Sequence, residues 1–366
     1  MKLKNNIGLI LLSIVYFECL FSDGFRVPIK LSYSSSFGYD SNVFRLSDLE
    51  RNQKYDQDIV IINSDTFDAP YINSRLGAKY APKIFKKFKT EFNFSFSGNS
   101  YITIPDKSFI VINSGFGIKL APYRWIKISH RYLPQYYLRN FRDKDYSIHD
   151  YYQTEFSSEG FVVLFSNRIY KKNWFRIKYS RTNLYYNDNF TEFDIEKNSF
   201  EAKLYCKILE FDSNLSYMIS IGNNPSYNQG YNSTIYDRSY TEHSYGVYTK
   251  KRIKKSNFIN VVGLSSIIKN RIFLDRSEVD VFDPLHNGRQ DIEYNFSIWV
   301  GNKINKKLSH EFKLKHRSKD VFSKYKINYY NGIGDVEEIL VSDLREYSKF
   351  EVVYKITYNI NLDVFR

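Results

Sequence analysis

The feature that most constrains the fold is a two-residue alternation of apolar and polar side chains, which recurs along most of the chain. In residues 89–98, three phenylalanines alternate with polar or small residues. The last such run, 346–365, holds eight apolar side chains in phase from Phe350 to Val364. Side chains of a β-strand point alternately to opposite faces, so each run predicts a strand with one apolar and one polar face. We therefore expect an all-β protein.

The connections between these runs alternate in length, giving seven long loops and six short turns. Long loops on one side, short turns on the other and an even strand number are typical of an outer-membrane barrel. Since a bilayer offers no water to unpaired backbone groups, a sheet that spans it must close. We predict a transmembrane antiparallel up-and-down β-barrel of about 14 strands, with a projecting hairpin near 329–335. The runs lie at 29–40, 70–82, 87–99, 108–121, 124–138, 151–166, 173–187, 197–211, 213–222, 240–252, 256–270, 290–303, 306–319 and 346–365.

The N-terminus has the pattern of a secretory signal. Two lysines precede an apolar run at 7–17, which is too short to cross a bilayer as a helix. We expect residues 1–22 to be a cleaved signal peptide and 23–366 to form the barrel. Cleavage removes two lysines and one glutamate, so the net charge of +13 becomes +12, and it leaves Cys206 as the one cysteine. An internal disulfide and a cysteine metal site are thereby excluded.

The strand pattern also predicts which side chains face lipid and which face the interior. The three tryptophans should lie at the short-turn end, on inward-facing positions: Trp125, Trp174 and Trp299. The residues expected to face lipid are Phe94, Ile128, Leu204, Phe296, Leu314 and Tyr354, and those expected to face inward are Asn93, Lys127, Lys203, Asn295, Lys313 and Lys355.

The polar faces of the runs carry more basic than acidic residues. An Arg or Lys facing lipid at the bilayer midplane costs about 2–4 kcal/mol, so these charges must line a lumen. They either form a basic wall that favours anions or fill the barrel through cross-strand ion pairs. Our candidates for the solute-facing wall are Arg75, Lys79, Lys127, Arg131, Arg176, Lys178, Lys203, Lys207, Lys313, Lys315 and Arg317.

The remaining charges of these faces complete the predicted wall. Nucleic-acid binding is not expected despite a pI near 9.3, because the chain is exported. The further basic residues are Lys89, Lys119, Lys349 and Lys355, and the acidic ones are Glu91, Glu155, Glu159, Glu201, Asp291, Glu293, Glu311 and Glu351.

The stretch 36–48, at the end of the first run, contains Asp40 and Asn42, which match the first half of a calcium loop. Phe44 and Arg45 stand where that loop needs further oxygen ligands and a glycine. Asp and Asn also stabilise turns through their side chains. We interpret the stretch as the end of the first strand, and expect no metal or cofactor.

Two histidine patterns raise the alternative of hydrolytic chemistry at the barrel rim. His316 precedes Ser318 by two residues, which resembles the Ser–His pair of outer-membrane phospholipases. His310 and His316 are expected on the outward face, near the membrane interface. The acidic loop at 275–286 resembles the rim of outer-membrane proteases; its residues are Asp275, Glu278, Asp280, Asp283 and His286.

The sequence GYDSNVFRLSD at 38–48, directly after the first strand, resembles the start of β-barrel porins of the bacterial outer membrane. Some of those barrels belong to exopolysaccharide-export systems. The resemblance implies a porin-like role and supplies no catalytic residues. Such barrels often end on an aromatic residue, whereas here Phe365 is penultimate.

We therefore predict a non-enzymatic channel of the bacterial outer membrane, for passive diffusion of small anionic or saccharide solutes. Tyr205 and Trp299 could stack on sugar rings. The alternative is a structural or partner barrel of a polysaccharide-export or surface-assembly system, with 58–63 of the first long loop folded into the lumen as a plug. The expected partners are outer-membrane lipid, lipopolysaccharide and small solutes.

Overall fold

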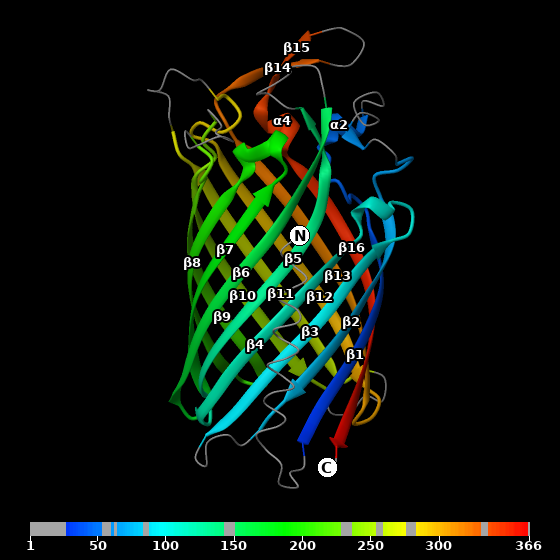
Figure 1. Ribbon diagram of the computed structural model, residues 1–366, viewed down its shortest axis with the longest axis vertical. Helices are drawn as coiled ribbons and strands as arrows, with labels where there is room; N and C mark the ends of the chain where they lie inside the picture. The colour runs from blue at the N-terminus through cyan, green and yellow to red at the C-terminus, as the bar shows by residue number, and fades with distance from the viewer. Residues whose placement is uncertain are drawn as a thin grey trace.

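The computed structural model describes residues 27–52, 60–61, 64–82, 88–142, 151–227, 236–253, 259–275, 283–330 and 336–364. These residues form one closed barrel of fourteen antiparallel strands, in which the last strand pairs with the first (Figure 1). The predicted signal peptide and Phe365 lie outside the described residues.

The strands follow the predicted runs closely. The largest displacement is in β11, which was expected from 256 and begins at Val261. The bounds are β1 (Val27–Asp40), β2 (Ala69–Tyr80), β3 (Lys89–Tyr101), β4 (Phe109–Ala121), β5 (Arg124–Arg142), β6 (Tyr151–Tyr170), β7 (Asn173–Tyr186), β8 (Ile195–Ile208), β9 (Phe211–Asn223), β10 (Tyr240–Arg252), β11 (Val261–Phe273), β12 (Gln290–Lys303), β13 (Leu308–Phe322) and β16 (Tyr347–Val364).

The long connections carry the remaining elements, all at one end of the barrel (Figure 1). The predicted hairpin is confirmed: β14 (Lys326–Tyr330) pairs with β15 (Val336–Leu340) outside the barrel sheet. The short helices are α2 (Asp48–Asn52), η1 (Pro105–Lys107), η2 (Asp188–Phe193) and α4 (Val341–Arg345). None of the helices in the described ranges has the length and apolar composition needed to cross a membrane.

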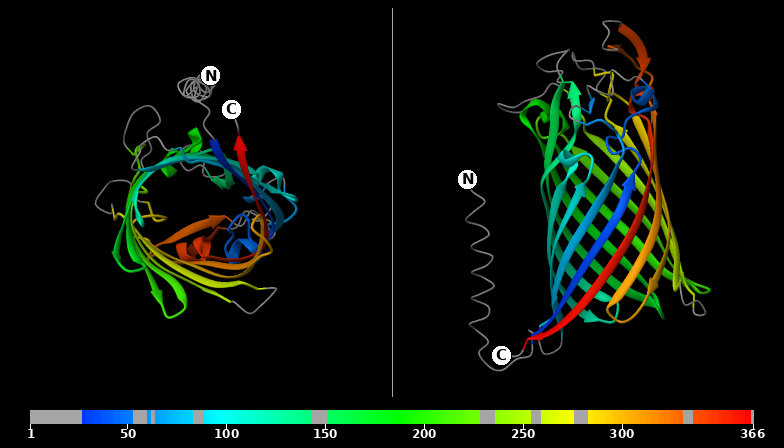
Figure 2. Two further views of the ribbon diagram at one scale, coloured as in Figure 1. Left: turned by 90° about the horizontal axis from the view of Figure 1, so that it is seen from below. Right: turned by 90° about the vertical axis from the view of Figure 1, so that its right-hand side faces the viewer.

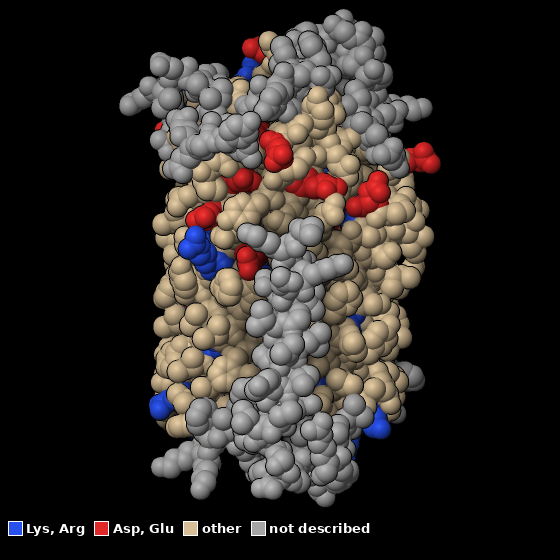
Figure 3. Space-filling model, viewed as in Figure 1, with Lys and Arg blue, Asp and Glu red and all other residues tan. Residues whose placement is uncertain are grey.

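The outer face of the barrel is apolar, as the alternation predicts. All six residues expected to face lipid are exposed, from 41% for Leu204 to 53% for Phe94. Their six neighbours on the other face are half-buried toward the interior. On the side drawn in Figure 3, acidic side chains gather toward the long-loop end and charge is sparse at mid-height. Water would penalise so much exposed apolar surface, so this face is a membrane-spanning wall.

The ladder between β5 and β6 is interrupted at two places. The register shifts between Leu133 and Tyr136 and again between Tyr137 and Arg139. Pro134 lies in the first interruption and has no N–H to give to a ladder, which explains the bulge there. Beyond this point β5 and β6 extend above the other strands toward the long-loop end (Figure 1).

Glu155 and Glu159 do not face the lumen, contrary to the prediction. Glu159 lies on the outer face, where its carboxylate contacts His130 Nε2 at 2.8 Å. The outward phase of β6 is set by Phe161, which is 54% exposed, whereas Phe156 points inward and packs against two tyrosine rings. The two phenylalanines stand on opposite faces, so the two glutamates fall on the outward one.

Candidate functional site: the lumen and its inserted loops

A cavity of about 700 Å³ opens on the inner wall formed by β1 to β5, in the half of the barrel that bears the short turns. The cavity exists because small residues occupy inward positions on four successive strands, where bulky side chains would fill the space: Ser32, Gly77, Ser95 and Gly115. The cationic side chains that line it are Lys30, Arg75, Lys79, Lys127, Arg131 and Lys306.

Most cations of this cavity form no ion pair with a carboxylate in the part of the chain that the structure describes. Lys79 pairs with Glu91. Arg75 donates to Ser95 Oγ at 3.1 Å, which is a neutral acceptor. Within the described residues, Lys127 and Arg131 form no ion pair. Among the described residues, positive charge therefore exceeds negative charge around the cavity, although Glu91 pairs with Lys79 and also attracts Lys127.

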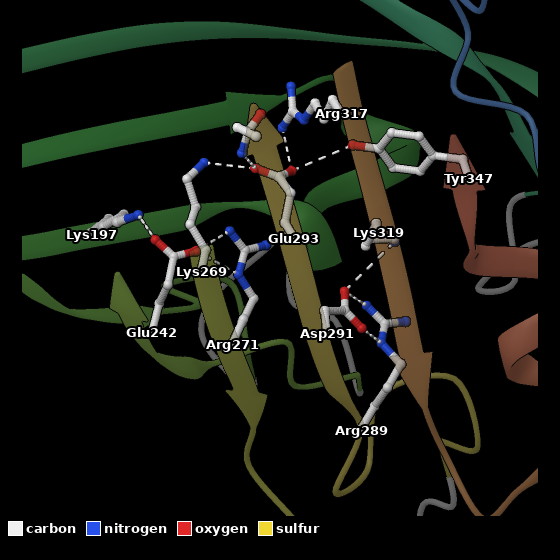
Figure 4. Close-up of polar contacts among 11 residues, drawn as sticks. Lys197, Glu242, Lys269, Arg271, Arg289, Asp291, Glu293, Arg317, Lys319 and Tyr347 are labelled. Carbon is white, nitrogen blue, oxygen red and sulfur yellow. Dashed lines mark hydrogen bonds and ion pairs between the residues drawn. The ribbon is translucent and has the colours of Figure 1, made fainter. Parts of the chain in front are cut away.

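The opposite wall has the reverse character, because several of its carboxylates are each shared by two or more cations (Figure 4). Glu242 lies 2.7 Å from Lys197 Nζ and 2.7 Å from Arg271 Nη2. Glu293 pairs with Lys269 at 2.8 Å and also with Arg317. These pairs hold neighbouring strands together and neutralise most of the charge on that wall.

The same arrangement recurs on both sides of this region. Glu201 binds Arg176, Lys178 and Lys203. Glu351 accepts from Lys315 Nζ at 2.7 Å. On this wall the inward charges therefore form cross-strand ion pairs, which is one of the two interpretations that the sequence left open.

The eleven predicted wall residues thus fall into different environments. Four of them line the cavity, namely Arg75, Lys79, Lys127 and Arg131. Lys313 lies over the Trp299 ring at 5.2 Å, and Lys207 is exposed near the end of β8. The other five form the ion pairs of the opposite wall. Whether any of them binds solute stays a prediction.

The first long loop enters the barrel mouth from the other end. We call its described part, 41–52, 60–61 and 64–68, the inserted loop. Leu46 and Ile61 are 0% and 1% exposed, in one apolar cluster with wall residues such as Tyr71 and Tyr137. Val60 and Ile61, from the segment 58–63, belong to the same buried cluster; that this segment plugs the lumen stays a prediction. Figure 2 shows α2 inside the ring of strands when the barrel is viewed along its length.

Local chemistry explains the shape of this loop. Ser47 Oγ accepts from the Glu50 backbone N–H at 3.1 Å, and Glu50 Oε2 accepts from the Ser47 N–H at 2.9 Å. This reciprocal capping box starts α2. Asn42 is fully buried and donates to the carbonyl oxygen of Leu46 at 2.9 Å, which folds the chain back on itself.

The calcium-loop alternative has no support in this geometry. Asp40 Oδ2 accepts from Lys349 Nζ at 2.6 Å, and Asp40 Oδ1 accepts from the Asn42 N–H at 3.1 Å. The carboxylate is therefore occupied by the protein. No group of three potential metal ligands occurs among the described residues.

Lys107 of η1 is a buried cation that no pattern in the sequence distinguishes from other lysines. Its Nζ donates to the carbonyl oxygens of Tyr137, at 3.1 Å, and Leu138, and it lies 4.7 Å from the Phe44 ring centre. Burial, with nearby Arg45 and Arg139, holds the pKa of Lys107 well below its usual range. The residue joins the inserted loop to β5.

A second inward element, α4, completes the mouth. Val341 is fully buried against Leu285 and Val321, and α4 contacts both α2 and β13 (Figure 2). Burial beside other arginines lowers the pKa of Arg345 to about 9. The inserted loop and α4 thus lie side by side and together narrow the long-loop end of the lumen.

The described part of the acidic loop considered for hydrolysis, Asp275 and 283–286, includes a buried histidine. His286 is 3% exposed and its Nδ1 lies 2.7 Å from Asp283 Oδ2. Burial and the neighbouring Arg238 hold the pKa of His286 well below its ordinary value. Glu278 and Asp280 lie outside the described residues.

His316 lies on the outer face, as expected, and so does His310, which packs on the outward Tyr354 ring at 5.9 Å. His316 Nε2 contacts Ser348 Oγ at 3.1 Å across the strand pair, rather than Ser318. Among the described residues, no carboxylate lies within hydrogen-bond distance of His316 to orient it. The H-x-S alternative raised by the sequence therefore finds no support in this geometry.

The tryptophans lie at the short-turn end, where the sequence placed them. Trp299 is 7% exposed and packs over Gly263, with Tyr248 at 5.0 Å. Tyr205 stacks on Trp174 at 3.6 Å between ring centres. Protein groups already cover these rings, so Trp299 offers no face to a sugar and Tyr205 has one face occupied.

No family model matches the chain, and no curated protein matches it by sequence. Its fold is similar to several solved outer-membrane proteins. An anion-selective porin from Comamonas acidovorans is 7% identical, with 91% of this chain and 99% of that chain covered and a TM-score of 0.43. OccAB3 of Acinetobacter baumannii is 9% identical, with 93% and 100% covered and a TM-score of 0.42. A loop-deletion mutant of OmpT from Vibrio cholerae is 7% identical, with 92% and 99% covered and a TM-score of 0.44. The likeness is one of barrel architecture.

Proposed function

We propose that this protein is an outer-membrane channel through which small solutes diffuse passively, with preference for anions. The observation that carries the proposal is the cavity on the inner wall, where Lys127 and Arg131 have no carboxylate partner among the described residues. Passive diffusion requires a wall that attracts solutes weakly, and unpaired side chains on a wet surface provide this.

The field inside a narrow wet pore supports the same conclusion. Low-dielectric walls focus the field of the unpaired cations, so the local anion concentration rises. Salt screens this field over about 10 Å at 0.1 M. Anion preference should therefore be clear in dilute salt and should decline as salt increases.

The test is the reversal potential of the purified barrel in a planar bilayer, under a potassium chloride gradient. Wild type should select chloride, and the triple variant R75Q/K127Q/R131Q should lose most of that preference. Cation selectivity in the wild type would contradict the proposal.

The buried inserted loop favours a second candidate, a closed barrel with a structural or partner role. Leu46 and Glu50 are as buried as core residues, so the inserted loop is held firmly against the barrel. A variant lacking 50–66 distinguishes the two candidates. Conductance that appears only after this deletion would favour the closed barrel.

A further inference from the structure

We propose that the cavity on the inner wall of β1 to β5 is a binding site for a compact polyanion, a small molecule with two or more carboxylate or phosphate groups. This inference deepens the proposed channel function by naming a substrate class. It also makes the passage of such solutes saturable.

The geometry begins with a polar row across four adjacent strands. Arg75 on β2 donates to Ser95 on β3 at 3.1 Å, and Asn113 on β4 donates to the same oxygen at 3.4 Å. Asn113 is the direct cross-strand partner of Arg131 on β5. Two guanidinium groups therefore flank a neutral hydroxyl–amide bridge on one continuous wall.

A second row lies closer to the short turns and adds an ammonium group. Lys127 stands opposite Gly117 on β4, and Gly115 is the next inward position of that strand. A Cβ on Gly115 would lie 3.2 Å from Ser129 Cβ and 3.5 Å from Lys127 Cε. Glycine thus leaves room for the Lys127 stem and keeps the floor of the cavity open.

The composition of the lining selects the ligand chemistry. The lining residues include no carboxylate, while Lys30 and Lys127 form no ion pair among the described residues. Guanidinium groups bind carboxylate and phosphate oxygens in a planar, bidentate manner. Several separated cations around one cavity favour a ligand with several separated negative charges over a single halide ion.

The size of the cavity is consistent with this class. A volume of about 700 Å³ lies within the range of about 300–1,000 Å³ found for small-molecule sites. Of its two lining residues with aromatic rings, Phe94 directs its side chain to the outer face, where it is 53% exposed, and His130 lies on the outer face beside Glu159. Without an inward ring the cavity lacks a stacking surface for a neutral sugar.

Citrate and inorganic pyrophosphate are suitable probes for the two chemistries. Each would be titrated into the detergent-solubilised full-length barrel by calorimetry, in dilute chloride buffer, and tested for block of the chloride current. We expect saturable binding of at least one probe in the wild type. R75Q/R131Q should bind it about tenfold more weakly, as expected when charge-assisted hydrogen bonds are lost.

K355Q is the matched control, because Lys355 faces the lumen on β16 outside this cavity and forms no ion pair among the described residues. It should bind the probe as the wild type does. K127Q is a second variant, which keeps the site testable if R75Q/R131Q fails to fold. It should weaken binding of the probe by an intermediate amount. Binding of citrate alone would assign the site to carboxylates, and binding of pyrophosphate alone to phosphates.

Equal affinity in R75Q/R131Q, K127Q and wild type, or no binding of either probe, would overturn the polyanion site. The channel proposal is tested separately, since the reversal potential in chloride alone needs no polyanion. Calorimetry in turn needs no conductance, so a closed barrel could still show the site.

Discussion

Arg139 Nη1 donates to Glu50 Oε2 at 2.9 Å, and the two side chains are only 7% and 3% exposed. This buried pair connects the inserted loop to the wall strand β5. It lies beside the capping box of α2, so one carboxylate both starts a helix and attaches it to the barrel.

Replacing Arg139 by methionine should release the inserted loop. Glu50 would then be a buried charge without its partner, which typically costs about 3–5 kcal/mol. We expect larger single-channel conductance with more frequent steps between levels. R181Q is the control, since its pair with Glu196 is also 2.9 Å long but exposed to 52% and 33%. Unchanged conductance in R139M would show that this pair does not hold the loop.

Phe94 and Asn93 provide a test of the membrane-facing wall from adjacent positions of one strand. F94K places a charge in the outer apolar belt near the middle of β3, where it should cost about 2–4 kcal/mol. N93K places the same side chain on the lumen side and should cost little. The measurement is the free energy of unfolding in urea, from lipid vesicles. Equal losses for the two variants would contradict the assigned faces.

Gly263 should be intolerant of any side chain because Trp299 lies against it. A Cβ there would overlap Trp299 Cζ2, so the indole must move. Such overpacking typically costs about 1–3 kcal/mol. G263A should shift the tryptophan fluorescence and lower the unfolding temperature. G117A is the control, since its nearest neighbour would lie at 3.6 Å; similar effects in both would refute the packing argument.

The loop that contains His286 should loosen in acid. Burial holds the pKa of the His286 imidazole below its ordinary value of about 6.5, so the packed loop favours the neutral ring. The stabilisation is complete above pH 6.5 and is lost as the pH falls toward the lowered pKa, by up to about 1.4 kcal/mol per unit. Amide exchange of 283–289, corrected for intrinsic rate, should increase between pH 7.5 and 5.5. H286Q should abolish that increase, and an equal increase in H286Q would assign the effect to another group.

Much of the fold could be predicted because strand periodicity is a local property. Apolar residues at i and i+2 lie on the same face of a strand, so the pattern within one strand shows which face is apolar. Phe94 and Tyr354 could therefore be assigned to the outer face without knowing which strands lie beside them. The same method failed for Glu159 because Phe156 and Phe161 stand on opposite faces of one strand. Both are apolar, and the sequence does not show which of them faces lipid.

The candidate site could be predicted only in part. The sequence identified Arg131 and Arg317 as inward cations, but it could not show that one lacks a carboxylate partner while the other pairs with Glu293. That difference depends on the register between strands far apart in the sequence. Lys107 could not be predicted at all, since its loop has no periodicity and its partners are backbone carbonyl oxygens and rings.

The pairing of β1 with β16 has a consequence for biogenesis. The ladder runs from Val27 opposite Val364 to Asp40 opposite Glu351. β1 is synthesised first, and its pairing with β16 cannot form until the last strand has been made. Until then the sheet has two open edges, which can pair with other chains. Contacts so distant in sequence also form slowly. The nascent protein must therefore be shielded from aggregation over its whole synthesis, and truncation before β16 should yield an insoluble chain rather than a smaller channel.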